Sequence, residues 1–147
     1  MKKIFLSLSL IMTAVASTAF ANEVTEPSPG LQEIFKQEFP GAQNVSWSKQ
    51  DGYQKATFIL GGRRSLAFFD SNNELAGSVR DLFYDQLPLT VMKAADKKFP
   101  EADFTEVREI NNADGTTYML TAETNSKKYK VKINSAGSIV ELEKVNK

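Results

Sequence analysis

The chain carries the same helix-like pattern twice, about sixty residues apart. The first copy reads LQEIFKQEFPGAQNVSW at positions 31–47, and the second reads VMKAADKKFPEADFTEV at 91–107. In both copies the apolar residues recur at i, i+3, i+4 and i+8, which places them on one face of a helix. A proline follows each pattern, at Pro40 and Pro100, and disfavours helix in the residue before it. We therefore predict two copies of one helix-then-strands unit.

The first 21 residues have the features of a cleavable leader. Lys2 and Lys3 precede a short apolar run at 4–16, and the sequence AFA at 19–21 matches an A-x-A cleavage site. The run is short and interrupted by serine and threonine, so it does not favour a membrane span. We expect a signal peptide at 1–21, a periplasmic or secreted protein, and no stable membrane insertion after cleavage.

Composition excludes several kinds of chemistry. Without the leader, the chain has 16 basic and 18 acidic side chains, a net charge of −2, which argues against nucleic-acid binding. The sequence contains neither histidine nor cysteine. Their absence removes thiol catalysis, histidine-based triads, disulfides and the usual zinc and copper sites. We expect no catalytic residue, metal or cofactor.

Turn signals predict how the rest of the chain is organised. Polar residues 22–28 predict a flexible N-terminal tether, and Ser28-Pro29 then predicts a capped helix start. Gly- and Asn-containing turns separate four expected strands, at 43–50, 53–60, 63–70 and 74–80. The duplicated domain at 29–147 is then divided into repeat one at 29–80, a connector at 81–87 and repeat two at 88–147. The predicted fold class is α+β, with two αββββ repeats forming a mostly antiparallel sheet and the helices packed on one face.

The second repeat shows which side of each strand faces the helix. A two-residue turn at 125–126 places Leu120 opposite Val131, which should be buried, and Thr121 opposite Lys130, which should face water. The lysines of 127–132 are therefore interpreted as a solvated strand face. Repeat two also has four extra residues in 111–115, which we expect to form a loop.

The first repeat differs because its outward face is apolar. A turn at Gly61-Gly62 places Ala56 opposite Ala67 under the helix, so the alternate residues point away from it. Those residues include the candidate partner-binding side chains Tyr53, Ile59, Leu66 and Phe68, with Trp47 as a further candidate. Three other interpretations stay open: cover by the tether or connector, a seam between the repeats, or a register error of one residue. Trp47 fits either a half-buried core ring or an exposed aromatic site with Tyr53.

These residues resemble a known family. The pattern F-P-x-A-x-x-V-x-W at 39–47, followed by Tyr53, the FFD strand end at 68–70 and the Leu87-Pro88 pair, is similar to PepSY-like, β-lactamase-inhibitor-like (BLIP-like) periplasmic proteins of Bacteroidetes-type bacteria. The resemblance covers about 31–143 and implies the αββββ repeats, without an established enzymatic activity. Repeat two departs from the motif at positions 105 and 107.

Three functional hypotheses follow. The first is a non-enzymatic exported binding module, inhibitor-like in form, that docks a protein of the cell envelope or a second copy of itself. The second is a small-molecule or glycan binder with Trp47 and Tyr53 as a stacking platform. The third is a carboxylate-dependent hydrolase with Asp81 and Asp85, although no motif fixes their geometry. Residues 70–74 partly match a calcium loop but lack its glycine and its distal glutamate, so we interpret them as a hairpin turn.

Overall fold

The computed structural model describes residues 24–145; the expected signal peptide at 1–21 lies outside the described residues. One helix and four strands are followed by a short 3₁₀ turn, a second helix and four more strands. The elements are α1 (Pro29–Glu38), β1 (Gln43–Gln50), β2 (Tyr53–Leu60), β3 (Arg63–Phe69), β4 (Leu75–Asp81), η2 (Tyr84–Gln86), α2 (Leu89–Lys98), β5 (Asp103–Asn112), β6 (Gly115–Glu123), β7 (Lys128–Asn134) and β8 (Ile139–Val145). No helix within 24–145 is long and apolar enough to cross a membrane.

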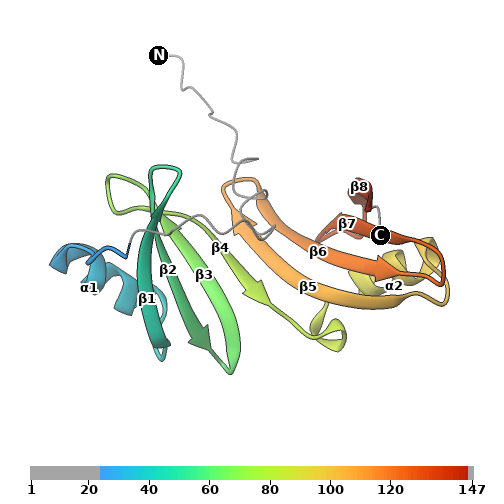
Figure 1. Cartoon of the computed structure of the whole chain (residues 1–147), viewed down its shortest axis with the longest axis horizontal. Helices are drawn as coiled ribbons and strands as arrows, with labels where there is room; N and C mark the ends of the chain where they lie inside the picture. Colours follow the sequence, from blue (N-terminus) through green and yellow to red (C-terminus); the bar gives the residue numbers. More distant parts are fainter. Residues whose placement is uncertain (1–23, 146–147) are drawn as a thin grey trace, which may run out of the picture.

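The strands form one eight-stranded antiparallel sheet in which each strand pairs with the next along the chain. Figure 1 shows α1 beside the first strands and α2 behind the later ones, toward opposite ends of the sheet. The strand bounds in the first half match the prediction to within one residue. Short turns explain this agreement, because their residues set where each strand stops.

Both helices begin and end as the sequence predicts. The Ser28 hydroxyl accepts a hydrogen bond from the Leu31 amide at 3.2 Å, and Pro29 occupies the first helical position of α1. Helix α2 has Pro88 at its N-cap. At their C-caps, Phe39 and Phe99 each donate a backbone hydrogen bond at 2.9 Å to the residue four positions earlier. The repeated Phe-Pro motif therefore ends both helices in the same way.

Two hairpin registers agree with the sequence prediction. Ala56 pairs with Ala67 between β2 and β3, and Leu120 pairs with Val131 between β6 and β7. All four side chains are buried under the helices. Thr121 pairs with Lys130 on the other side of the sheet, as expected. Thr121 is only 2% exposed, however, so the expectation that it faces water was wrong. A register error of one residue is thus excluded for both hairpins.

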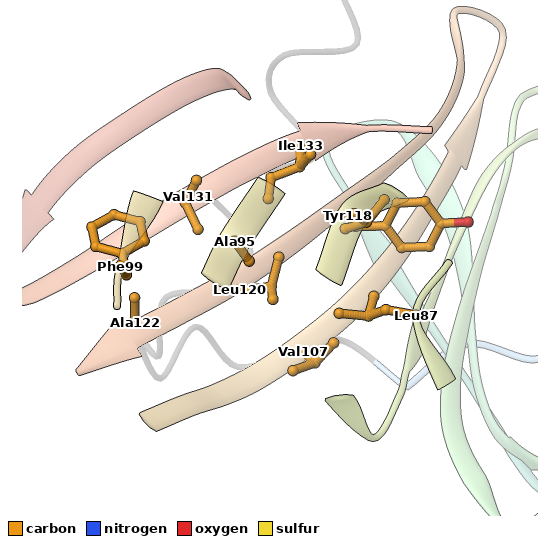
Figure 2. Packing of buried hydrophobic residues seen from close by; sticks show 10 residues of the cluster. Leu87, Ala95, Phe99, Val107, Tyr118, Leu120, Ala122, Val131 and Ile133 are labelled. Carbon is orange, nitrogen blue, oxygen red and sulfur yellow. The ribbon is translucent and has the colours of Figure 1, made fainter. Parts of the chain in front are cut away.

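Each helix covers its own hydrophobic core. The α1 core consists of Leu31, Phe35, Ala56, Phe58, Ala67 and Phe69. The α2 core, drawn in Figure 2, includes Val91, Ala95, Phe99, Val107, Tyr118, Leu120, Ala122, Val131 and Ile133. Aromatic rings dominate the first core, where the Phe35 and Phe58 ring centroids are 5.0 Å apart in an edge-to-face arrangement.

The two halves meet where β4 pairs with β5, a junction that we call the seam. Residues Gly77 to Asp81 pair with Arg108 to Asn112. The four extra residues of the second half contribute here: Asn111 and Asn112 belong to β5, and the turn is confined to 113–114. The expectation of a loop was therefore wrong. The added residues lengthen a hairpin because they gain backbone hydrogen bonds with β4.

The described part of the expected tether, 24–28, is attached to the sheet edge. The Thr25 amide donates to the Trp47 carbonyl at 3.3 Å, and Val24 forms an isolated bridge with Ser48 on β1. The Thr25 hydroxyl also lies 3.2 Å from the Gln54 side-chain oxygen. Residues 24–28 are therefore not the flexible tether that we expected. They attach to β1 because the outer edge of that strand has backbone groups free to form hydrogen bonds.

Candidate functional site

The two helices lie on the same face of the sheet. Phe58 under α1 and Tyr118 under α2 belong to one row of directly paired residues that crosses all the strands between them. Paired residues in a sheet project from the same face. We call the opposite face of the sheet the distal face, and both described helices lie away from it.

At the seam, the helix side of the sheet is polar and the distal face is apolar, the opposite of the arrangement under the helices. Between the helical cores, the row on the helix side consists of Ser65, Arg80 and Glu109. On the distal face the same strands place a hydrophobic cluster, which we call the seam cluster. Its buried members are Leu66, Phe68, Val79 and Ile110, with Tyr53 and Met119 packed against them. The apolar surface therefore changes sides where no helix lies above the sheet in the described structure.

Part of this cluster was predicted from sequence. The predicted residues Tyr53, Leu66 and Phe68 all lie in the cluster on the distal face. Ile59 shares that face, opposite Arg64. The predicted set omitted Val79, Ile110 and Met119, which extend the cluster into the second half. Of the three other interpretations, a seam between the halves therefore describes this cluster correctly.

The seam cluster has a buried floor, formed by Leu66, Phe68, Val79 and Ile110, and a more accessible rim, formed by Tyr53, Ile59 and Met119. Leu66 is only 7% exposed and Phe68 only 3%. Tyr53, Ile59 and Met119 are half-buried. Phe68 was predicted to be a partner-binding side chain, but at 3% exposure it offers a partner little surface. Phe68 instead belongs to the buried part of the cluster, against which Tyr53 and Met119 pack.

The placement of Trp47 in the partner-binding set is also incorrect. Trp47 pairs with Ala56, which faces α1, whereas Tyr53 projects from the distal face. The indole ring lies 5.2 Å from the Phe35 ring and 6.0 Å from the Phe69 ring, between centroids. Trp47 is therefore a half-buried core residue. The position of Trp47 under α1 was predictable from the sequence, because the Asp51-Gly52 turn aligns Trp47 with Ala56.

Charged side chains line one side of the seam cluster. Asp81 on β4 accepts a hydrogen bond from Arg108 Nε at 3.3 Å and lies 4.0 Å from an Arg64 nitrogen. Lys55 pairs with Phe68 on the other side of the Leu66 row, and its Nζ donates to the Gln50 side-chain oxygen at 2.9 Å. Burial and the nearby Arg64 charge lower the pKa of Lys55, an effect that Asp51 partly opposes.

The acidic candidates do not form a catalytic pair. Asp81 is engaged by two arginines, and Asp85 lies in η2 on the exposed connector. The hairpin at 70–74 is closed by Asp70, whose carboxylate accepts backbone hydrogen bonds from Asn72 and Glu74 at 2.8 and 3.0 Å. Within residues 24–145, no group of three or more acidic, histidine or cysteine side chains could hold a metal ion.

A polar network that the sequence did not predict occupies the helix side of the seam. Glu109 accepts hydrogen bonds from Arg80 at 3.3 Å and from Asn111 at 3.2 Å. The Thr116 hydroxyl donates to the Asn111 side chain at 2.6 Å. Burial and Glu109 together raise the pKa of Tyr118. These mutual hydrogen bonds satisfy the polar side chains between the two cores and do not create an unpartnered ligand site.

Comparison with solved structures identifies the fold. A BLIP-like protein from Bacteroides fragilis superposes with a TM-score of 0.74 at 22% sequence identity, covering 84% of this chain and 89% of its own. A DUF2874 family protein from Bacteroides ovatus gives a TM-score of 0.72 at 22% identity, covering 82% and 89% of the two chains. A protein from Bacteroides eggerthii, whose periplasmic location is itself a prediction, gives 0.72 at 18% identity, covering 82% and 90%.

These similarities establish a BLIP-like fold, as the sequence resemblance implied. The names of these neighbours describe a fold or a family and no enzymatic activity. No protein-family model matches the chain, and no curated protein matches it either. The function must therefore be argued from the distal face itself.

Proposed function

We propose that this protein is a non-enzymatic exported module that docks a protein partner of the cell envelope through the distal face of its sheet. The observation that carries the proposal is the seam cluster, an apolar group on a sheet face away from both helices, with Tyr53, Ile59 and Met119 partly accessible around it. Apolar patches bordered by charges are typical of protein–protein contact surfaces.

The leader and the fold support the rest of the proposal. The predicted signal peptide at 1–21 and the predicted periplasmic location of the Bacteroides eggerthii neighbour favour export. The BLIP-like name of the Bacteroides fragilis neighbour favours an inhibitor-like form of docking, in which the sheet blocks a surface of its partner. The matching Phe C-caps of α1 and α2 favour an origin of both halves from one αββββ unit.

The alternatives are less well supported. A stacking platform for glycans needs Trp47 and Tyr53 on one side of the sheet, and they lie on opposite sides. A hydrolase needs two carboxylates that face each other across a substrate, whereas Asp81 is neutralised by arginines. Association with a second copy uses the same distal face, so it is an outcome of the test below.

The docking proposal is tested by placing charge on the accessible rim. Residues 22–147 carrying Tyr53→Lys and Ile59→Lys should fail to retain an envelope protein that the unmodified chain retains from a membrane-free envelope extract. Val140→Lys is the matched control, because Val140 is 53% exposed on β8, at the far edge of the sheet. Sedimentation of the purified chain reports self-association. Retention of the same protein by both variants would overturn the proposal.

Lysine substitutions in the buried floor of the cluster should have a different effect. Leu66→Lys and Phe68→Lys place charges at positions that are 7% and 3% exposed. Burial of an unpaired ammonium is costly, so this double variant should lose its cooperative thermal unfolding as well as its partner. A folded double variant with unchanged stability would show that the seam cluster is accessible as a whole.

A further inference from the structure

The first described residues run along the outer edge of β1 in a single register. Val24 forms an antiparallel bridge with Ser48, and the Thr25 amide donates to the Trp47 carbonyl at 3.3 Å. The two contacts agree with each other, because Thr25 lies opposite Trp47 whenever Val24 lies opposite Ser48 in an antiparallel pair. The chain therefore approaches β1 as a strand would.

This register continues to the end of β1. Lys49 and Gln50 are the last two residues of that strand, and antiparallel pairing assigns Glu23 to Lys49 and Asn22 to Gln50. Residues 22 and 23 lie outside the described residues. Cleavage at the site that the sequence predicts, after position 21, leaves only these two residues ahead of the described part. The expected mature chain would thus begin level with the end of β1.

Lys49 has the backbone and side-chain groups that such an extension needs. Backbone groups alternate in direction along a strand, and Trp47 accepts from Thr25 at the outer edge, so Lys49 also directs its N–H and C=O outward. The Lys49 side chain is exposed, on the face that it shares with its β2 partner Gln54. In this register Glu23 belongs to the same face, and opposite charges would face each other across the two strands.

Strand β1 is the sheet edge that most needs cover. Free strand edges promote pairing with another chain, and charged side chains, bulges and covering segments oppose it. Strand β8, at the other edge, has three charged residues in seven, whereas β1 has one in eight. A bulge between Gln43 and Ser46 interrupts the first half of β1. The second half is where the N-terminal residues lie.

We propose that residues 22–25 of the mature chain form a ninth strand, which closes the outer edge of β1 against a second copy of this protein. The inference takes the predicted cleavage after position 21 as its premise, and it does not depend on docking through the distal face. Backbone hydrogen bonds hold the strand, and the Glu23–Lys49 pair selects its register. The N-terminus is then a structural part of the sheet.

Two proline substitutions in the chain 22–147 test the backbone contacts. Thr25→Pro removes the amide that donates to Trp47. Val24→Pro is the matched control, because the Val24 amide points away from β1, where an edge strand tolerates proline. The Lys49 amide should exchange with solvent about two- to tenfold faster in Thr25→Pro, the effect of losing one ordinary hydrogen bond. Its exchange should be unchanged in Val24→Pro. Thermal unfolding verifies that each variant is folded.

Charge reversal tests the register. Glu23→Lys should make the Thr25 amide exchange about two- to fivefold faster, because two ammonium groups would then face each other. Lys49→Glu should have a similar effect, and the double variant should restore the exchange rate of the unmodified chain. Glu26→Lys is the control: it makes the same change of charge at an exposed position beyond the proposed strand, and it should leave the rate unchanged.

Each part of the inference can fail separately. Equal exchange of the Lys49 amide in the two proline variants would overturn the ninth strand, and a double charge variant that does not restore the rate would overturn the register. Sedimentation tests the closing role: Thr25→Pro should self-associate more strongly than Val24→Pro, and equal association would overturn that role. Intact mass of the exported chain identifies its first residue; a mature chain that begins after Val24 would lack the strand and overturn the inference.

Discussion

Gly77 on β4 lies directly opposite Asn112 on β5, and a Cβ on Gly77 would come within 2.9 Å of the Asn111 carbonyl oxygen. That separation is shorter than real Cβ contacts allow, and the obstructing atom belongs to the backbone. The two halves of the sheet thus approach each other at a position that only glycine fits. The seam depends on this close approach, because β4–β5 pairing is what joins them.

We therefore predict that Gly77→Ala destabilises the protein by about 1–3 kcal/mol, the usual cost of overpacking. Urea unfolding measures the loss, and amide exchange should accelerate first at β4 and β5. Gly30→Ala is the control, because Gly30 lies in α1 with no atom within 4 Å of the added methyl group. It should leave stability unchanged or raise it by up to about 1 kcal/mol. Equal effects of the two changes would contradict the role of the seam.

A second glycine holds the start of α2 against the β7–β8 turn. Gly137 has a φ of +85°, and an added Cβ would lie 2.8 Å from the Thr90 carbonyl oxygen. Gly52 has the same φ but open space around it. Gly52→Ala should cost about 1–2 kcal/mol from backbone strain alone, and Gly137→Ala should cost more because it also displaces α2. Chemical denaturation of both variants compares them; identical losses would rule out the steric contribution.

Tyr84 joins the connector to α2. Its hydroxyl donates to Asp96 at 2.6 Å, and its ring stacks on Phe104 at 4.7 Å. Burial, reinforced by the bond to Asp96, raises the pKa of Tyr84. Tyr84→Phe should cost about 1–3 kcal/mol at neutral pH, because a charge-assisted hydrogen bond is lost. The free energy of unfolding of the two proteins gives this difference.

The Tyr84 hydrogen bond also predicts a pH dependence. A raised tyrosine pKa stabilises the folded state fully below the unfolded value near pH 10, and this contribution is lost as the pH rises above it. The stability difference between the unmodified chain and Tyr84→Phe should therefore shrink at alkaline pH. Asp96→Asn keeps an acceptor without the charge and should shift less. A difference that is constant from pH 8 to pH 11 would argue against the pKa shift.

Glu106 on β5 predicts the opposite pH dependence. It sits at a bulge with a φ of 50°, and its carboxylate accepts a hydrogen bond from the buried Thr121 hydroxyl at 2.7 Å. That bond is the main cause of its lowered pKa, with smaller contributions from Arg108 and nearby lysines, while burial opposes them. The resulting stability is present above the ordinary carboxyl pKa and is lost as the pH falls through the folded value.

We expect the unmodified chain to lose more stability than Glu106→Gln between pH 7 and pH 3. Urea unfolding across this range measures both. Thr121→Val removes the hydrogen-bond donor and should abolish most of the extra acid sensitivity. If Thr121→Val retains it, the neighbouring charges are the main cause instead of the hydrogen bond.

The candidate site was only partly predictable. Some of its residues are placed by a turn close to them in the sequence, whereas their burial depends on strands far away in the sequence. Tyr53, Leu66 and Phe68 follow from one two-residue turn, which fixes the β2–β3 register and hence the face of each side chain. The same reasoning applied to the Asp51-Gly52 turn would have placed Trp47 under α1. The floor-and-rim division of the seam cluster could not be predicted, because burial depends on neighbours from distant strands.

The sequence by itself determined the helices, their caps and the hairpins, since each is set by residues within a few positions of one another. The tertiary structure decided how the halves join. Between β4 and β5 lie a connector and α2, so no turn sets the register of Val79 against Ile110. That pairing depends on the packing of the whole sheet. It extends the apolar surface of the distal face into the second half and places Arg108 opposite Asp81.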